Sequence, residues 1–134
     1  FKMFRFLQIY VQLFLQAQNS SQMDIIEWKD FEKVSLVSGT IVAVEDYPEA
    51  RNPAYKVKVD LGEAIGIKKS SAQITSHYSK DQLMGKQVIC VTNFAPKQIG
   101  KFMSEVLITG FPDENGAVVL ASIDQKVKNG SHLF

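Results

Sequence analysis

Residues 35–123 alternate between short apolar runs and polar turns. The clearest alternation is AYKVKVDLG (54–62), in which Tyr55, Val57 and Val59 share one face and charged residues occupy the other. The other β-branched or apolar runs are SLVSGTIVAVEDY (35–47), AIGIKKSS (64–71), KQVICVTNF (86–94), SEVLITGF (104–111) and AVVLASI (117–123). We predict a strand in each of these segments.

Two turn signals and one glycine refine this pattern. Asn115-Gly116 is a hairpin signal between the last two predicted strands, and Asn129-Gly130 marks a final turn before SHLF. Gly39 lies inside a long β-branched run, where a glycine predicts a bulge or a sharp bend.

Two segments have helical rather than strand spacing. MDIIEWKDFEKV (23–34) predicts a short helix with Asp24 as its N-cap. AQITSHYSKDQLMG (72–85) also looks helical, with Ser79 as a cap and Gly85 as its end.

The order of these elements predicts an all-β fold. A sheet of short strands must close or be covered to hide its edges, which favours a small barrel over an open sheet. The predicted helix after the third strand matches an OB-fold, a five-stranded Greek-key barrel. We therefore expect an OB barrel with a short N-terminal helix, a helical insertion after strand 3 and extra C-terminal strands.

The first twenty-two residues do not follow this pattern. They place two cations, Lys2 and Arg5, before an apolar run that glutamines interrupt. The odd positions from Leu7 to Leu15 are aliphatic, as in a strand, but Leu7, Val11 and Phe14 also share a helical face. We expect residues 1–22 to be a non-family N-terminal extension, native or introduced by cloning, and residues 23–134 to be the functional domain. The run is too short and too polar to span a bilayer, so we expect no membrane insertion.

Composition argues for a single binding domain rather than an enzyme. The chain has 134 residues and one cysteine, Cys90, which lies in an apolar run and is expected to be a buried hydrophobe in a reducing, cytoplasmic setting. His77 and His132 lack metal-ligand spacing, and the adjacent carboxylates Glu45 and Asp46 point to opposite faces of a strand. We therefore expect no catalytic residues, no metal site and no cofactor.

Positive charge is concentrated in the middle of the chain. Residues 51–101 contain nine Lys or Arg and three Asp or Glu, whereas residues 23–50 contain two and seven. Lysines attract phosphates, and Ser, Asn and Gln bond base edges and 2′-hydroxyls, so this region predicts RNA binding on a barrel face. The candidate RNA-binding residues are Lys56, Lys58, Lys68, Lys69, Ser71, Gln73, Asn93, Lys97, Gln98, Lys101 and Ser104. Phe94 and Phe102 could stack bases, although next to strands we favour core positions for them.

From Met23 onward the chain resembles a known family. The resemblance rests on DFEKVSLVSGTIVAVEDYPEARNPAYKVKVDLGE, IGIKKSSAQIT, VTNFAPKQIGKFMSEVLITGFPDENGAVVL and the terminal NGSHLF. These stretches are similar to the tRNA-binding OB domain of EMAP-II-like proteins, which is also appended to some methionyl-tRNA synthetases. By position, the motif residues of the family fall on Ser71, Gln73, Asn93, Lys97, Ser104 and Glu105.

The resemblance implies a tRNA-binding homodimer, with the N-terminal helix and the C-terminal strands at the interface. For free-standing members it also implies a chaperone role in protein export, with unfolded preproteins or the export machinery as partners. The chain departs from the family pattern at two points. The usual glycine falls on Lys101, while the glycine here is Gly100, and Lys97 stands where many relatives have arginine.

Two alternatives to RNA binding stay open. The protein could be a chaperone that binds unfolded preproteins through an apolar groove, with weak RNA binding or none. It could also be a structural dimer module whose basic face has no strong ligand. RNA binding should fall steeply with salt, whereas apolar peptide binding should not.

Overall fold

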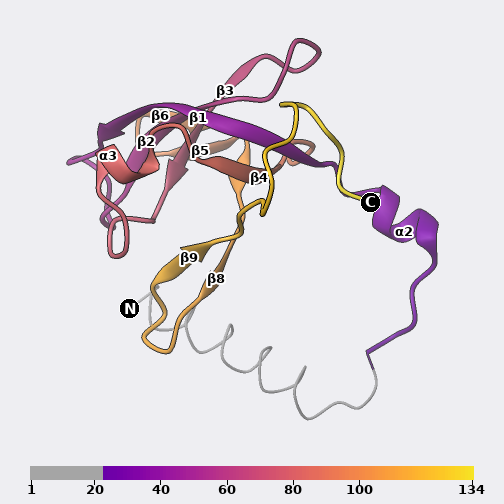
Figure 1. Cartoon of the computed structure of the whole chain (residues 1–134). Helices are drawn as coiled ribbons and strands as arrows, with labels where there is room; N and C mark the ends of the chain where they lie inside the picture. Colours follow the sequence, from indigo (N-terminus) through magenta and orange to yellow (C-terminus); the bar gives the residue numbers. More distant parts are fainter. Residues whose placement is uncertain (1–22) are drawn as a thin grey trace. The chain divides into compact units, whose positions relative to one another are not determined.

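The computed structural model describes residues 23–134 (Figure 1), and the strand or helix expected within residues 1–22 lies outside this range. The chain divides after Phe31 into two compact units. Helix α2 spans Trp28–Glu32 and buries none of its residues. The short N-terminal helix is thus confirmed, but Asp24 is not its cap. The helix starts four residues later, where Asp30 accepts a hydrogen bond from the backbone N–H of Glu27 at 3.0 Å.

The main sheet has five antiparallel strands in the order β3-β2-β1-β4-β7. Its strands are β1 (Leu36–Asp46), β2 (Tyr55–Asp60), β3 (Ile67–Ala72), β4 (Gln87–Val91) and β7 (Leu107–Ile108). The first three form a meander, and β4 returns to pair with β1, which is the Greek-key arrangement. The sheet curls into a nearly closed barrel, so the predicted OB-type fold is confirmed.

Strand β1 bends at a bulge between Ile41 and Ala43, where its register with β2 shifts. The predicted irregularity therefore exists, but not at Gly39. Gly39 has a different role, because a Cβ there would lie 2.5 Å from Cγ1 of Val59. Glycine lets β1 and β2 approach closely at this point.

The predicted helix over residues 72–85 is much shorter in the structure. Only α3 (Lys80–Leu83) is helical, and residues 75–77 form a turn. The cap at Ser79 is confirmed: Gln82 N donates to Ser79 Oγ at 3.3 Å, and Ser79 N donates to Gln82 Oε1 at 2.9 Å. Leu83 anchors this turn in the core, with 0% of its surface exposed.

The second half of the chain forms two further hairpins. Strands β5 (Lys97–Ile99) and β6 (Phe102–Ser104) pair with each other, as do β8 (Gly110–Pro112) and β9 (Val118–Leu120). The segment 95–103, which separates two predicted strands and was expected to be a loop, is therefore partly a hairpin. The single strand expected over residues 104–111 is broken, because Thr109 changes partners: its N–H donates to Ile89 O, and its carbonyl accepts from Ala121 N. The turn signal at Asn115-Gly116 is confirmed.

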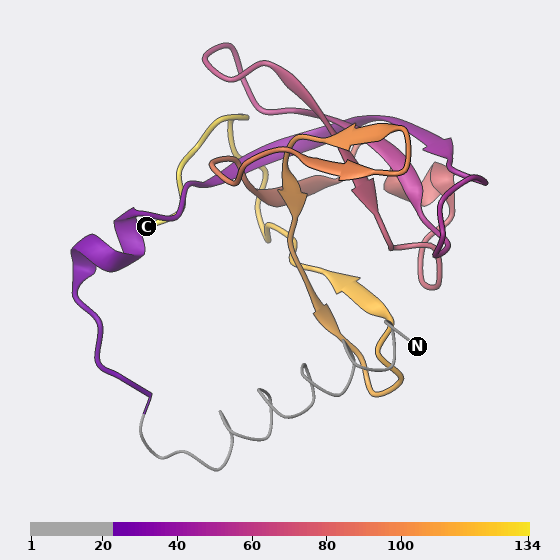
Figure 2. The same ribbon diagram turned by 180° about the vertical axis from the view of Figure 1, so that it is seen from behind.

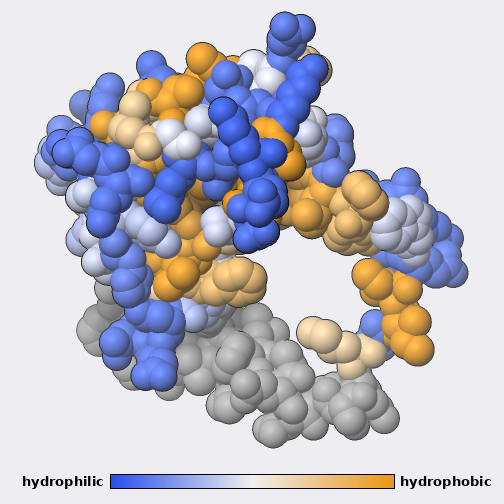
Figure 3. Space-filling model, in the orientation of Figure 1, coloured by the Kyte–Doolittle hydropathy of each residue, from blue (hydrophilic) through white to orange (hydrophobic). Residues whose placement is uncertain are grey.

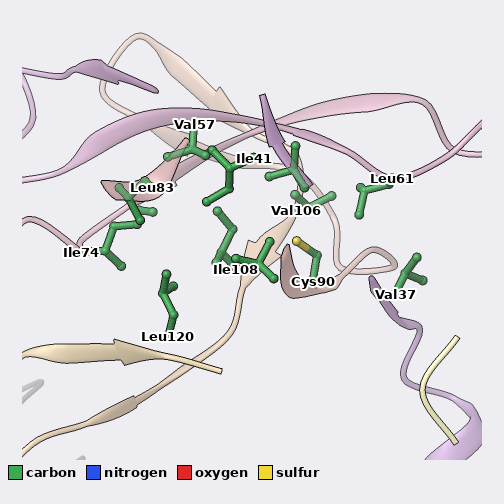
Figure 4. Packing of buried hydrophobic residues seen from close by; sticks show 13 residues of the cluster. Val37, Ile41, Val57, Leu61, Ile74, Leu83, Cys90, Val106, Ile108 and Leu120 are labelled. Atoms are coloured by element: carbon green, nitrogen blue, oxygen red, sulfur yellow. The ribbon is translucent and has the colours of Figure 1, made fainter. Parts of the chain in front are cut away.

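The core fills the barrel interior with aliphatic side chains. Val57 and Val59 of β2 and Val37 of β1 are fully buried, as the alternation predicts. Figure 4 shows Cys90 of β4 among these side chains. Burial raises the pKa of its thiol to about 12, so Cys90 is a buried hydrophobe, as predicted.

Candidate nucleic-acid interface

Three lysines of adjacent strands share one outer face of the barrel. Lys58 of β2 lies directly opposite Lys69 of β3, and Lys56 lies opposite Ser71. Directly paired residues project to the same side of a sheet, with their Cβ atoms about 5 Å apart. The outer positions are thus cationic, while the alternate positions Val57 and Ser70 are buried. We call the surface formed by Lys56, Lys58, Lys69, Ser71 and Phe102 the basic face.

A shallow pocket of about 50 Å³ lies at the centre of the basic face. Its lining residues are Ala43, Glu45, Lys56, Val57, Lys58, Lys69 and Phe102. Three cations, one carboxylate and one aromatic ring therefore meet at one place. This composition suits an anionic, partly aromatic ligand better than an apolar one.

Phe102 of β6 is part of this pocket and is absent from the core. Its ring packs against Tyr47 at 5.8 Å between centroids, tilted by 55°. Two ammonium groups lie near the same ring, with Lys69 Nζ at 5.2 Å and Lys56 Nζ at 5.6 Å from its centroid. The expected core position of Phe102 is wrong, and so is that of Phe94, which is 57% exposed.

The β5–β6 hairpin is fixed by Tyr47 at its turn. The Tyr47 hydroxyl donates to the Ile99 carbonyl at 2.6 Å. Gly100 has a φ of +62°, and a Cβ there would lie 2.6 Å from the Tyr47 hydroxyl oxygen. Glycine at position 100 therefore accommodates both a positive φ and the close approach of Tyr47. The next residue, Lys101, is exposed.

The β5–β6 hairpin, orange in Figure 2, lies along β3. Ser104 and Glu105 hold it to the free edge of that strand. Ser71 N donates to Ser104 Oγ at 3.0 Å. Lys69 N donates to Glu105 Oε1 at 3.2 Å, and Glu105 N donates to Lys69 O at 2.8 Å. These bonds occupy edge groups of β3 and nearly close the barrel. Both side chains are thereby engaged within the protein.

Asn93 and Gln98 are also engaged by the backbone. Asn93 Nδ2 donates to Lys33 O at 2.7 Å, and its Oδ1 accepts from Ser35 N at 2.9 Å. This pins the segment before β1 to the end of β4. Gln98 Nε2 donates to Gly100 O at 2.8 Å and so supports the turn.

The remaining predicted residues lie at different places. Lys97 is exposed on β5, opposite Ser104. Gln73 is exposed just after β3. Lys68 lies opposite Val59 and so belongs to the other face of the sheet from Lys69. The structure thus brings Lys56, Lys58, Lys69 and Ser71 together, with Lys97, Gln98 and Lys101 on the adjoining hairpin, and separates Lys68 from them.

Sequence reasoning missed the role of Tyr47 and Glu45. Glu45 lies opposite Lys56 in the β1–β2 register and lines the pocket, whereas Asp46 lies on the other side and accepts a hydrogen bond from Lys80 Nζ at 2.7 Å. The expected separation of the two carboxylates is confirmed. The hydrogen bond and charge of Asp46 raise the pKa of Lys80 above its usual value.

His77 is exposed and bonded to the β8–β9 loop. Its Nε2 lies 2.6 Å from Asp113 Oδ2, and this hydrogen bond holds the pKa of Asp113 below its usual range. Within residues 23–134, no group of three or more His, Cys, Asp or Glu side chains could hold a metal ion. None of the helices in that range is long and apolar enough to cross a membrane.

Comparison with known sequences places the chain among nucleic-acid-associated domains. Residues 36–132 match the family model described as a putative tRNA binding domain. The methionine–tRNA ligase of Thermococcus onnurineus is 31% identical over 118 residues, which are 88% of this chain but 16% of the ligase. The chain therefore spans only a small part of the length of this relative.

Comparison with solved structures finds proteins of about this size. The chaperone CsaA from Bacillus anthracis has a TM-score of 0.77 and 39% identity, covering 83% of this chain and 100% of that one. The CsaA chaperone protein from Picrophilus torridus has a TM-score of 0.76 and 44% identity, covering 82% of this chain and 100% of its own.

Proposed function

The chain belongs to the family of putative tRNA-binding domains, and from this premise we propose that it binds tRNA, without catalysis, through the basic face. The observation that carries the proposal is the clustering of Lys56, Lys58 and Lys69 around one pocket that also holds Phe102. Three ammonium groups from neighbouring strands of one sheet face can contact several phosphates at once. We further propose residues 23–134 as the domain responsible.

The β5–β6 hairpin extends this surface. Lys97 and Lys101 are exposed on it and add two flexible cations. Lysines attract phosphate as point charges without the two-pronged geometry of arginine, so this part of the surface favours backbone attraction over precise recognition. Ser71, which is paired with Lys56, and Gln73, which is exposed just after β3, supply groups that hydrogen-bond 2′-hydroxyls.

Four predicted residues act differently in this proposal. Asn93, Gln98, Ser104 and Glu105 already bond within the protein, so we assign them to positioning the interface rather than to direct contact. Lys68 contributes only long-range attraction, because its register places it on the other face of the sheet.

A salt series tests this function on the full chain. Labelled bulk tRNA is titrated with the protein and followed by fluorescence anisotropy at increasing KCl. Three to five phosphate contacts predict a log–log slope of about −2 to −5. Changing Lys56, Lys58 and Lys69 together to glutamine should flatten the slope by about 2 to 3. No binding at low salt would refute the proposal.

A second candidate function rests on exposed apolar surface. An open pocket of about 290 Å³ is lined mainly by aliphatic residues and by Phe134, which is 96% exposed. On the face shown in Figure 3, hydrophobic surface lies between hydrophilic patches. The two CsaA structures carry the name chaperone, and a chaperone would bind unfolded preproteins at such a surface.

This second candidate has its own test. The full chain should suppress aggregation of a chemically unfolded protein at stoichiometric ratios, and 0.5 M KCl should not abolish the effect. Suppression that disappears with salt would point back to the basic face. Homodimerisation, a link to protein export and a cytoplasmic location are further parts of the proposal, and light scattering after size-exclusion chromatography tests the first of them.

A further inference from the structure

The ring of Phe102 is held in place at the surface. It is half-buried on β6 and packs against Tyr47, which is only 5% exposed. The Tyr47 hydroxyl is bonded to Ile99 of the same hairpin, so ring and hairpin are fixed together. A partly exposed aromatic ring with a fixed orientation is a ready surface for stacking.

The charges around this ring are unusual for a simple apolar contact. Lys56 and Lys69 place their ammonium groups 5.6 Å and 5.2 Å from the ring centroid. Lys56 also lies 4.7 Å from the centroid of Tyr47. An apolar peptide would gain nothing from two cations, and a duplex backbone would gain nothing from the ring. A flat base next to a phosphate uses both.

We propose that Phe102 stacks one unpaired nucleobase while Lys56, Lys58 and Lys69 contact the adjoining phosphates, so that the basic face prefers RNA containing an unpaired nucleotide. This inference rests on the proposed function and specifies its ligand. The base takes the place of the ammonium groups over the ring. That exchange is favourable because a base–aromatic stack is stronger than an exposed cation–π contact, and the released ammonium groups then meet phosphate.

The size of the pocket limits how the base is recognised. About 50 Å³ has room for a few water molecules and not for a whole base. The base therefore lies across the pocket mouth, flat on the ring, without having its edges read. Stacking of this kind tolerates all bases, so single strands of different sequence should bind within about threefold of each other.

A comparison of two RNAs tests the inference. The full chain is titrated with a labelled ten-nucleotide single strand and with a duplex of equal length, and Phe102→Leu and Phe102→Tyr are compared. Phe102→Leu should weaken binding of the single strand about tenfold. The fold-loss for the single strand should be at least five times the fold-loss for the duplex. Phe102→Tyr keeps an aromatic face and should lose much less. The salt slope of Phe102→Leu should match that of the unaltered protein, since no phosphate contact is removed.

Any other outcome contradicts the proposal that Phe102 stacks a base. Unchanged single-strand binding by Phe102→Leu, with loss in the triple lysine variant, rejects stacking but keeps the proposed function. If Phe102→Leu loses the same affinity for the single strand and the duplex, and Phe102→Tyr does not restore it, the ring has only a structural role. Failure of the unaltered protein to bind any RNA rejects the proposed function itself.

A measurement on the unaltered protein covers the case in which Phe102→Leu does not fold. A single strand with one 2-aminopurine flanked by uridines should lose fluorescence on binding, because stacking quenches this base. The 2-aminopurine is moved along the strand in a series of RNAs. RNA that binds without any change in 2-aminopurine fluorescence, wherever this base is placed, would contradict the inference.

Discussion

Glu105 is bonded to Lys69 through both its backbone and its side chain. Its N–H donates to Lys69 O at 2.8 Å, and its Oε1 accepts from Lys69 N at 3.2 Å. On the other side, Lys69 is paired with Lys58 of β2. Both backbone hydrogen-bonding groups of Lys69 are therefore occupied by Glu105, while strand pairing places the Lys69 side chain beside that of Lys58 on the basic face. The bonds that nearly close the barrel are thus made to a residue of the basic face.

Glu105 should consequently matter for stability more than for RNA contact. Glu105→Ala leaves the N–H of Lys69 without its acceptor and should lower the free energy of unfolding by about 1–3 kcal/mol. Glu105→Gln keeps an acceptor oxygen and should cost less. Urea denaturation followed by circular dichroism measures both. A loss of tRNA affinity in Glu105→Gln with unchanged stability would instead indicate that the carboxylate contacts RNA.

Removing a carboxylate from the basic face should strengthen RNA binding. Glu45 lines the pocket opposite Lys56 and repels phosphate, so Glu45→Gln should raise tRNA affinity about two- to fivefold at low salt. Asp46→Asn is the matched control, because it changes the net charge equally on the other side of the strand. Anisotropy titrations compare the two. Equal gains would show that only net charge matters and that this face is not the binding surface.

The turn of the β5–β6 hairpin should not accept a side chain. Gly100→Ala places a Cβ against the Tyr47 hydroxyl at a φ of +62° and should lower the free energy of unfolding by about 1–2 kcal/mol or more. Tyr47→Phe removes the hydroxyl and its bond to Ile99, at a cost of about 1 kcal/mol. The double variant should lose less stability than the sum of the losses in the two single variants, because the hydroxyl that the alanine Cβ would contact is absent. Strict additivity in thermal unfolding would show that the hydroxyl does not restrict position 100.

The bond between His77 and Asp113 should make stability pH-dependent in acid. It holds the pKa of Asp113 below the unfolded-state value, so Asp113 stabilises the fold above about pH 4. That contribution is lost as the pH falls through the folded-state pKa. The stability difference between the unaltered protein and Asp113→Asn should be full at pH 6 and shrink below pH 4. Urea titrations at each pH measure it, with Glu114→Gln as the control in the same loop. A difference that is constant from pH 6 to pH 3 would contradict this account.

Most of the strands are predictable from the alternation of apolar and polar residues. Alternation in residues 54–62 marks which side chains enter the core, and one buried face is enough to specify a strand. The family resemblance is likewise confirmed by the match over residues 36–132. The prediction of a helix over 72–85 is wrong for residues 72–79, because an apolar residue such as Ile74 is buried from an irregular segment rather than from a helical face.

The basic face was only partly predictable. The alternation of strand residues places Lys56 and Lys58 on the same face. It also places Lys68 and Lys69 on opposite faces, so the inclusion of both among the RNA-binding candidates is wrong as a single surface. Tyr47 could not be assigned from sequence, because its contact with Phe102 depends on how the β5–β6 hairpin folds back over the barrel. The bonds of Glu105 to Lys69 depend on tertiary closure in the same way.

Lys68 and Lys69 offer the most direct test of the central claim. They are adjacent on β3, carry the same charge and project to opposite faces. We would measure tRNA binding of Lys69→Gln and Lys68→Gln over a salt series, using the full chain. We predict that Lys69→Gln weakens binding at least threefold and reduces the salt slope by about 1, whereas Lys68→Gln has a clearly smaller effect on both. Equal effects of the two substitutions, or a larger effect of Lys68→Gln, would contradict binding at the basic face.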